Sequence, residues 1–189
     1  MAAKVLIVGP EQSGKSTIAN MLAGVVSAAP HDRDEPEDIS LRDQPYRATA
    51  AVRVVEFEAQ LTSSQARNWG GDRSVEVEIW DTSGATKYES CWPAIQQKAD
   101  GVVIVYNPEN PNHLAEVETW YEWFVVKTGL KQDQCLVLAN DRNSGPEDPR
   151  ANPPAVLDDC ELIYTDASDA DKIKTAFQDL VATIGSFKE

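Results

Sequence analysis

The stretch GPEQSGKS, residues 9–16, constrains the fold more than any other feature of this sequence. It fits the pattern G-x-x-x-x-G-K-S, directly follows the apolar run VLIV, and precedes a helical pattern at Lys15–Ala23. Glycines at these positions let the backbone curl so that successive N–H groups point at phosphate oxygens, and the helix N-terminus adds partial positive charge. The sequence therefore predicts a nucleotide-binding phosphate loop between a buried strand and a helix.

The residues expected to bind the nucleotide phosphates in this loop are Glu11, Gln12, Ser13, Gly14, Lys15, Ser16 and Thr17. Lys15 is expected to bridge the β- and γ-phosphates, and the Ser16 hydroxyl is expected to ligate Mg²⁺. The alternative is an ordinary strand–turn–helix with an ordinary lysine.

Short apolar runs alternate with helical patterns along the chain, which indicates an α/β sheet. The runs VLIV and GVVIV lack polar alternation, as expected for strands covered on both faces, whereas 52–61 and 75–80 alternate like a hairpin nearer an edge. The predicted fold class is therefore α/β, of the P-loop NTPase type. The expected strands are Lys4–Val8, Val52–Leu61, Val75–Trp80, Gly101–Tyr106, Cys135–Ala139 and Leu162–Tyr164.

Two apolar stripes at helical spacing mark further helices, the second beginning near Ser168–Asp169. We expect both stripes to face the core. The acidic segment 31–45 and the proline-rich segment 144–154 fit no regular element, and no repeat or second-domain boundary is visible, so one domain over 1–189 is expected. The stripes are Leu114, Val117, Trp120, Phe124 and Val125, and then Ile173, Phe177, Leu180, Val181 and Ile184.

Composition narrows the range of partners. Seventeen Lys and Arg against 31 Asp and Glu give a formal net charge of −14, which makes nucleic acid and anionic lipid poor partners. A basic protein surface is a better candidate, although the charge is equally consistent with a role in solubility alone. The three cysteines have no metal-site spacing and are expected to be reduced thiols in a cytosolic protein. No signal peptide, membrane span or C-terminal prenylation cysteine is expected.

A second phosphate-site element is Asp81, at the end of the strand VEVEIW. An acid at the tip of a buried strand suits the ligand that holds Mg²⁺ through water in a P-loop protein. The Thr-Ser-Gly that follows places Gly84 where its N–H can sense a γ-phosphate, which couples the next loop to the nucleotide state.

Residues 9–16, YRAT at 46–49 and WDTSG at 80–84 together resemble the Rab-type small GTPases, over essentially the whole chain. The resemblance implies a six-stranded, mostly parallel sheet flanked by helices, with GTP or GDP and Mg²⁺ as cofactors. It places Thr49 at the switch I threonine that meets Mg²⁺ and the γ-phosphate, and Gly84 in switch II.

Three further segments, KYESCWPA at 87–94, GVVIVYN at 101–107 and WYEWFV at 120–125, resemble the Rab-like proteins of intraflagellar transport. This narrower resemblance implies coiled-coil subunits of the intraflagellar transport B complex as partners, with no lipid anchor. It also implies a location in the cytoplasm, in the cilium or flagellum and at its base.

Two departures from the Rab pattern bear on hydrolysis. Ala85 stands where the family has the glutamine that orients the attacking water, and a methyl group cannot do this, so no catalytic residue is assigned. Glu11 stands where many family members need a small residue to accommodate the transition state. Both changes predict slow hydrolysis, below unassisted family rates that are already on the order of 10⁻⁴ per second.

Guanine recognition also departs from the pattern. The family's Asn-Lys-x-Asp run appears here as Asn140-Asp141-Arg142-Asn143, in which Asn143 offers a neutral amide oxygen in place of a carboxylate. The resemblance implies that Asn140, Asn143, Ala167 and Ser168 contact the base, with reduced affinity or relaxed specificity. A simple strand-ending turn is the alternative for this segment.

These features favour a nucleotide-dependent binding module in which GTP and Mg²⁺ order the two switches. Two alternatives stay open. One is an active GTPase that uses a non-standard or partner-supplied catalytic residue, which single-turnover hydrolysis with and without the partner would reveal. The other is a constitutive scaffold in which nucleotide only stabilises the fold, which normal partner binding by nucleotide-free protein would support.

Overall fold

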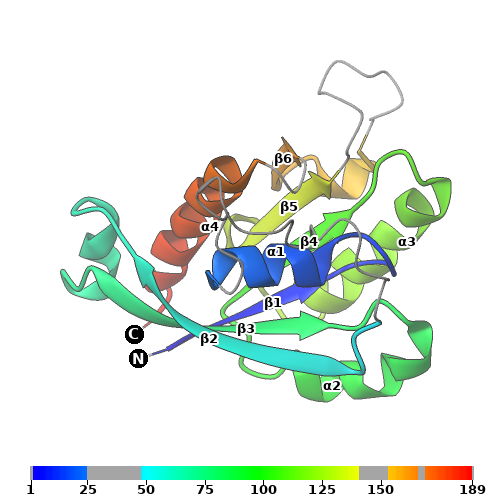
Figure 1. Ribbon diagram of the computed structural model, residues 1–189, viewed down its shortest axis with the longest axis horizontal. Coiled ribbons are helices and arrows are strands. Elements are labelled where there is room, and N and C mark those ends of the chain that lie inside the picture. The colour runs from blue at the N-terminus through cyan, green and yellow to red at the C-terminus, as the bar shows by residue number, and fades with distance from the viewer. Residues whose placement is uncertain (1, 25–47, 141–152, 166–168, 189) are drawn as a thin grey trace, which may run out of the picture.

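A six-stranded sheet forms the centre of the computed structural model, which describes residues 2–24, 48–140, 153–165 and 169–188 (Figure 1). Its strands lie in the order β2-β3-β1-β4-β5-β6, and only β2 runs antiparallel, paired with β3 as the predicted hairpin. The prediction of a mostly parallel six-stranded sheet is confirmed. The strands are β1 Ala3–Val8, β2 Val52–Gln60, β3 Ser74–Thr82, β4 Gly101–Tyr106, β5 Cys135–Asn140 and β6 Glu161–Thr165.

Helices connect the strands where the apolar periodicity predicts them. The first begins at Lys15 as expected, and the last begins at Ala170. The helices are α1 Lys15–Leu22, α2 Trp92–Ile95, α3 Pro111–Tyr121 and α4 Ala170–Gly185, with short 3₁₀ turns η1 Gln65–Trp69, η2 Thr86–Cys91, η4 Gln132–Gln134 and η5 Ala155–Leu157.

One predicted helical stripe divides into two elements. The segment from Leu114 to Val125 begins as α3 but continues from Tyr121 into a π-helical turn, η3 Glu122–Val126. The N–H of Lys127 reaches back five residues to the Glu122 carbonyl, at 2.9 Å. This wider turn lets the consecutive residues Phe124 and Val125 both face the core.

Two helical layers cover the two faces of the sheet. One core cluster joins β1, β3, β4 and β5 to α1 and α4, with Ile18 and Phe177 at its centre, and the other joins the opposite face to α2 and α3. All six residues of β4 are buried, which explains why GVVIVY carries no polar alternation. In Figure 1 both termini lie at one end of the sheet, and the Lys188 ammonium donates to the Ala2 carbonyl.

The parallel strands present their carboxyl ends at one edge, and the loop after β1 opens there. In P-loop and other open α/β sheets this edge is where ligands bind. No helix of the described segments is both long and apolar enough to cross a bilayer. The segment 31–45 and most of 144–154, together with Asp141, Arg142, Asn143, Ala167 and Ser168, lie outside the described residues.

The segment ESCWPA contributes a buried tryptophan to the core. Trp92 is only 2% exposed, and its ring centroid lies 4.6 Å from that of Trp120 and 5.4 Å from that of Phe124. Trp123 also touches Trp92, at 5.5 Å, but keeps one side near solvent, under the Lys127 ammonium.

Replacement of Trp92 by alanine is therefore expected to lower the free energy of unfolding by about 3–5 kcal/mol, because it removes a fully buried aromatic from three ring contacts. Trp123→Ala, the matched control, should cost less than half as much. Urea unfolding followed by circular dichroism measures both changes. Equal losses for the two variants would contradict the packing described above.

Candidate functional site

The phosphate loop curls tightly between β1 and α1. Gly14 adopts a φ of +99°, and a Cβ there would lie 2.3 Å from the Nδ2 atom of Asn140, so the left-handed backbone and the close side chain both require glycine. Gln12 also has a positive φ, +60°. Ser13 is buried, whereas Glu11, Gln12 and Thr17 are exposed. The loop backbone thus has the curled shape that a phosphate cradle needs.

Lys15 turns its ammonium into the curve of this loop. The side chain is 6% exposed, and Nζ donates to the Pro10 carbonyl and, at 3.3 Å, to the Ser13 hydroxyl. Burial lowers the pKa of Lys15 to about 8, against the opposing charges of Asp81, Glu11 and Glu116. A buried ammonium held by a loop carbonyl is a cation poised for a stronger anionic partner, such as phosphate oxygens.

The residues predicted to ligate the metal converge from three elements. Ser16 lies in the first turn of α1, Thr49 precedes β2, and Asp81 lies near the end of β3. The hydroxyl oxygens of Ser16 and Thr49 are 2.9 Å apart, although 33 positions separate the two residues in the sequence. Hydroxyl and carboxylate oxygens are the ligand types that Mg²⁺ selects, alongside water and phosphate.

Asp81 is a fully buried carboxylate in which one oxygen accepts a hydrogen bond and the other has no donor among the described residues. Its Oδ2 accepts from the Arg53 guanidinium at 3.1 Å, whereas Oδ1 has no hydrogen-bond partner among the residues described. Burial raises the pKa of Asp81, and the Ser16 hydroxyl, Arg53 and Lys15 act in the opposite direction. A buried acceptor without a donor fits the expected group, because a metal-bound water would donate to it.

The start of the predicted switch II presses against the phosphate loop. A Cβ on Gly84 would lie 2.4 Å from the Glu11 nitrogen and 2.5 Å from the Pro10 carbonyl carbon. Only glycine permits this approach, so the backbone of 83–85 and the loop share one packed contact. The two segments therefore pack directly against each other.

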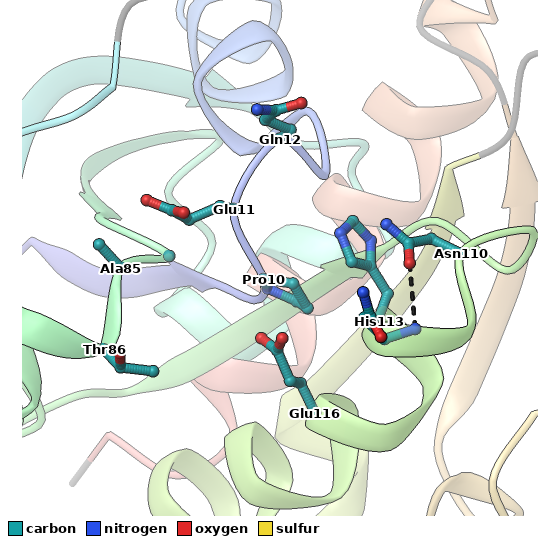
Figure 2. A pocket seen from close by; sticks show the side chains of 10 residues that line it. Pro10, Glu11, Gln12, Ala85, Thr86, Asn110, His113 and Glu116 are labelled. Atoms are coloured by element: carbon teal, nitrogen blue, oxygen red, sulfur yellow. Dashed lines mark hydrogen bonds between the residues drawn. The ribbon is translucent and has the colours of Figure 1, made fainter.

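Beside this contact lies a cavity of about 360 Å³ between the phosphate loop, residues 84–86 and the N-terminus of α3. Figure 2 shows the Glu11 carboxylate directed toward Ala85 and the Glu116 carboxylate rising from α3 toward Pro10. The Ala85 methyl group and the exposed Thr86 bring no amide to this region.

His113 is a site residue that the sequence analysis missed. It is 6% exposed at the start of α3, and its Nδ1 accepts from the Asn107 N–H at 3.1 Å. Burial lowers the pKa of His113, with the Lys15 charge in the same direction, while a hydrogen bond to the Glu11 carbonyl opposes the shift. The neutral ring therefore joins the end of β4 to the phosphate loop, and no sequence pattern indicates that connection.

Arg53 is a second site residue that was not predicted, although the predicted β-hairpin places it near Asp81. In the β2–β3 hairpin Arg53 lies directly opposite Asp81. Opposite charges at facing cross-strand positions attract. The hairpin was predicted, so its register would have identified this pair.

Of the predicted base-binding residues, only Asn140 lies among those described. Its Nδ2 donates to the Ser13 carbonyl at 2.8 Å, while its Oδ1 is buried without a partner. Asn140 thus ties the end of β5 to the phosphate loop and leaves one acceptor for a ligand. The roles assigned to Asn143, Ala167 and Ser168 stay predictions.

A Gly84→Ala substitution tests the contact between switch II and the phosphate loop. The added methyl group must move residue 84 away from Glu11, which withdraws its N–H from the γ-phosphate position. We expect affinity for GTP to fall at least tenfold, about 1.4 kcal/mol, with little change for GDP. Fluorescent-nucleotide titration measures both affinities, and equal losses would argue against γ-phosphate sensing at residue 84.

The lowered pKa of His113 predicts acid sensitivity. In the unfolded chain the pKa of this histidine has its ordinary value of 6.5, and in the folded chain it is lower. As the pH falls below about 6.5, the unfolded chain therefore binds more protons than the folded chain, and the free energy of unfolding decreases. His113→Asn keeps an acceptor for the Asn107 N–H but cannot be protonated. Its unfolding free energy should fall less between pH 7.5 and 5.5 than that of the unmodified chain. An unchanged pH profile in this variant would show that another group is responsible.

The comparisons with known proteins agree with this geometry. A family model described as the Ras family matches residues 43–186. Two proteins named intraflagellar transport protein 22 homolog are similar in sequence. The Danio rerio protein is 36% identical over 86% of this chain and 78% of its own length, and the Bos taurus protein is 37% identical over 89% and 82%.

Solved structures are similar over nearly the whole chain. A T. brucei IFT22/74/81 GTP-bound crystal structure contains a chain with a TM-score of 0.71 and 29% identity, covering 97% of this chain and 95% of that one. A T. brucei IFT22 GDP-bound crystal structure gives a TM-score of 0.61 at 28% identity, covering 96% and 94%. The chain belongs to the Ras family of small GTPases and, within it, to the intraflagellar transport protein 22 homologues.

Proposed function

We propose that this protein is a GTP- and Mg²⁺-dependent binding subunit of the intraflagellar transport B complex, with very slow intrinsic hydrolysis. The observation that carries the proposal is the convergence at one point of the Ser16–Thr49 hydroxyl pair and the Gly84–Glu11 contact. Thr49 and Gly84 belong to the two segments that nucleotide state moves in this family. Both segments contact residues of the phosphate loop, Thr49 through Ser16 and Gly84 through Glu11. A γ-phosphate bound in the loop would therefore lie beside both segments.

Each site residue has a proposed role. The backbone of 11–17 surrounds the phosphates, and Lys15 exchanges the Pro10 carbonyl for the β- and γ-phosphate oxygens. Ser16 and Thr49 would hold Mg²⁺, and Asp81, whose Oδ1 has no donor among the described residues, would supply a further acceptor beside the ion. The ion would neutralise phosphate charge and hold switch I against α1.

The slow hydrolysis follows from what surrounds the expected position of the attacking water. Ala85 supplies no amide there, and His113 commits both ring nitrogens to the backbone of Asn107 and Glu11. The Glu11 carboxylate lies on the same side and would repel a nucleophile that is gaining negative charge. Hydrolysis then depends on a residue from a partner.

The proposed partners follow from the relatives. One similar T. brucei structure is described as IFT22/74/81 in the GTP-bound state. We propose that this chain likewise binds coiled-coil subunits of that complex, in the cytoplasm and in the cilium or flagellum. The net charge of −14 favours a basic partner surface. Guanine is the proposed base, read in part by the free Oδ1 of Asn140.

Pull-down of the partner subunits by three forms of the protein tests nucleotide dependence. GTP-loaded protein should recover the partners, whereas GDP-loaded protein and Ser16→Asn, which cannot complete the metal site, should recover at least tenfold less. Thr175→Ala, which removes an exposed hydroxyl on α4 outside the phosphate loop, serves as the matched control. Equal recovery of all forms would replace the switch with a constitutive scaffold.

The hydrolysis claim has its own test. Ala85→Gln combined with Glu11→Gly restores a water-orienting amide and removes the crowding carboxylate, so single-turnover hydrolysis should accelerate at least tenfold, which corresponds to about 1.4 kcal/mol of barrier. Each single substitution should give a smaller gain. A rapid rate in the unmodified chain, or no gain in the double variant, would favour a different catalytic group.

A further inference from the structure

Two cysteines stand side by side at the edge of the sheet opposite the nucleotide site. Cys135 is the first residue of β5, and Cys160 immediately precedes β6. The register pairs Leu136 with Glu161, so Cys135 and Cys160 occupy facing positions one step earlier. Neighbouring strands lie about 4.8 Å apart, within the Cα separation of roughly 4.4–6.8 Å that a disulfide spans.

The side chains of these two cysteines also meet. Both belong to the core cluster beneath α2 and α3, and each lies close enough to the other to shift the pKa of its thiol. Tyr121, at the end of α3, is a second neighbour that lowers the pKa of the Cys160 thiol. Both thiols are free in this structure. The facing positions in the register and the shared core cluster therefore indicate that a bond between the sulfurs needs little backbone movement.

The two thiols differ in their exposure to solvent and in their pKa. Cys160 is half-buried, and its neighbours Cys135 and Tyr121 lower its pKa, against opposing contributions from burial and Asp159. Cys135 is 1% exposed, and the pKa of its thiol is raised. The thiolate is the reactive form of cysteine. We therefore expect an oxidant to react first with Cys160, which has the lower pKa and is more exposed, and Cys135 to react only afterwards.

We propose that Cys160 and Cys135 form a hydroperoxide-sensitive dithiol, in which Cys160 is the attacked thiol and Cys135 the resolving thiol. The Cys160 thiolate attacks one peroxide oxygen, the O–O bond breaks, and hydroxide leaves, which converts Cys160 to a sulfenic acid. The Cys135 sulfur then attacks the Cys160 sulfur, the S–OH bond breaks, and water leaves with the Cys135 proton. One peroxide is reduced and one disulfide is formed.

Tyr121 positions the Cys160 thiolate in this scheme. Its hydroxyl would donate to the sulfur, which favours the charged form and orients it. The disulfide would fix the starts of β5 and β6, the two strands whose far ends lead to Asn140 and to segment 166–168. Because the bond closes a loop of about 25 residues, the oxidised chain should unfold at a higher temperature than the reduced chain.

The third cysteine provides a matched control. Cys91 is also a half-buried free thiol packed against the same core cluster, but it lies on η2, away from the start of β5. An oxidation governed only by exposure would modify Cys91 and Cys160 alike. The proposed pair predicts a marked preference for Cys160.

The test exposes the full-length, nucleotide-loaded protein to a slight molar excess of hydrogen peroxide, and stops the reaction with an alkylating agent. Intact mass should decrease by about 2 Da, with a 135–160 cross-linked peptide that dithiothreitol reverses. Cys135→Ser should accumulate a dimedone-reactive sulfenic acid on Cys160, Cys91→Ser should behave like the unmodified chain, and Tyr121→Phe should react several-fold more slowly. Preferential modification of Cys91, intermolecular dimers, or no cross-linked peptide in the unmodified chain would overturn the proposal.

Discussion

The buried carboxylate of Asp81 is the constraint around which the nucleotide end of this fold is organised. A fully buried charge is costly unless charged or hydrogen-bonding groups surround it. Here the compensation comes from β2 through Arg53, from the phosphate loop through Lys15 and from α1 through Ser16. The lysine is itself buried and is held by a loop carbonyl. The two charges therefore stabilise one another within a shell that phosphate and a divalent cation would complete.

A parallel sheet separates this polar edge from the rest of the molecule. The strands β1, β4 and β5 are buried on both faces, so polar groups are concentrated where the strands end. At the carboxyl ends lie Lys15, Asp81 and Asn140, and at the amino ends of β5 and β6 lies the thiol pair. The two core clusters between the sheet and the helices bury the apolar side chains on both faces of these strands.

Much of this fold follows from local pattern, and the remainder does not, for a physical reason. All six predicted strands match the observed ones to within two residues at each end, because apolar runs and alternation report burial directly. The short elements η2 and α2 were not predicted, since four to six residues carry no periodicity and are fixed by the packing of Trp92. The motifs likewise predicted Ser16 and Asp81 as metal-site residues, and the structure brings both to the same end of the sheet. The connection from His113 to Glu11 depends on how α3 approaches the phosphate loop, which no single segment encodes.

Binding and catalysis place different demands on this site, and its residues are better matched to the first. Ground-state affinity needs the backbone cradle, Lys15 and the metal ligands, and the geometry brings all of these together. Acceleration of hydrolysis needs groups that interact more strongly with the transition state than with bound GTP. The cavity beside the phosphate loop is lined in part by the methyl group of Ala85 and by the carboxylates of Glu11 and Glu116, which oppose the build-up of negative charge. Such a composition is suited to holding a triphosphate rather than to cleaving it, and under the proposed function the lifetime of the bound state would be set by a partner that supplies a cation.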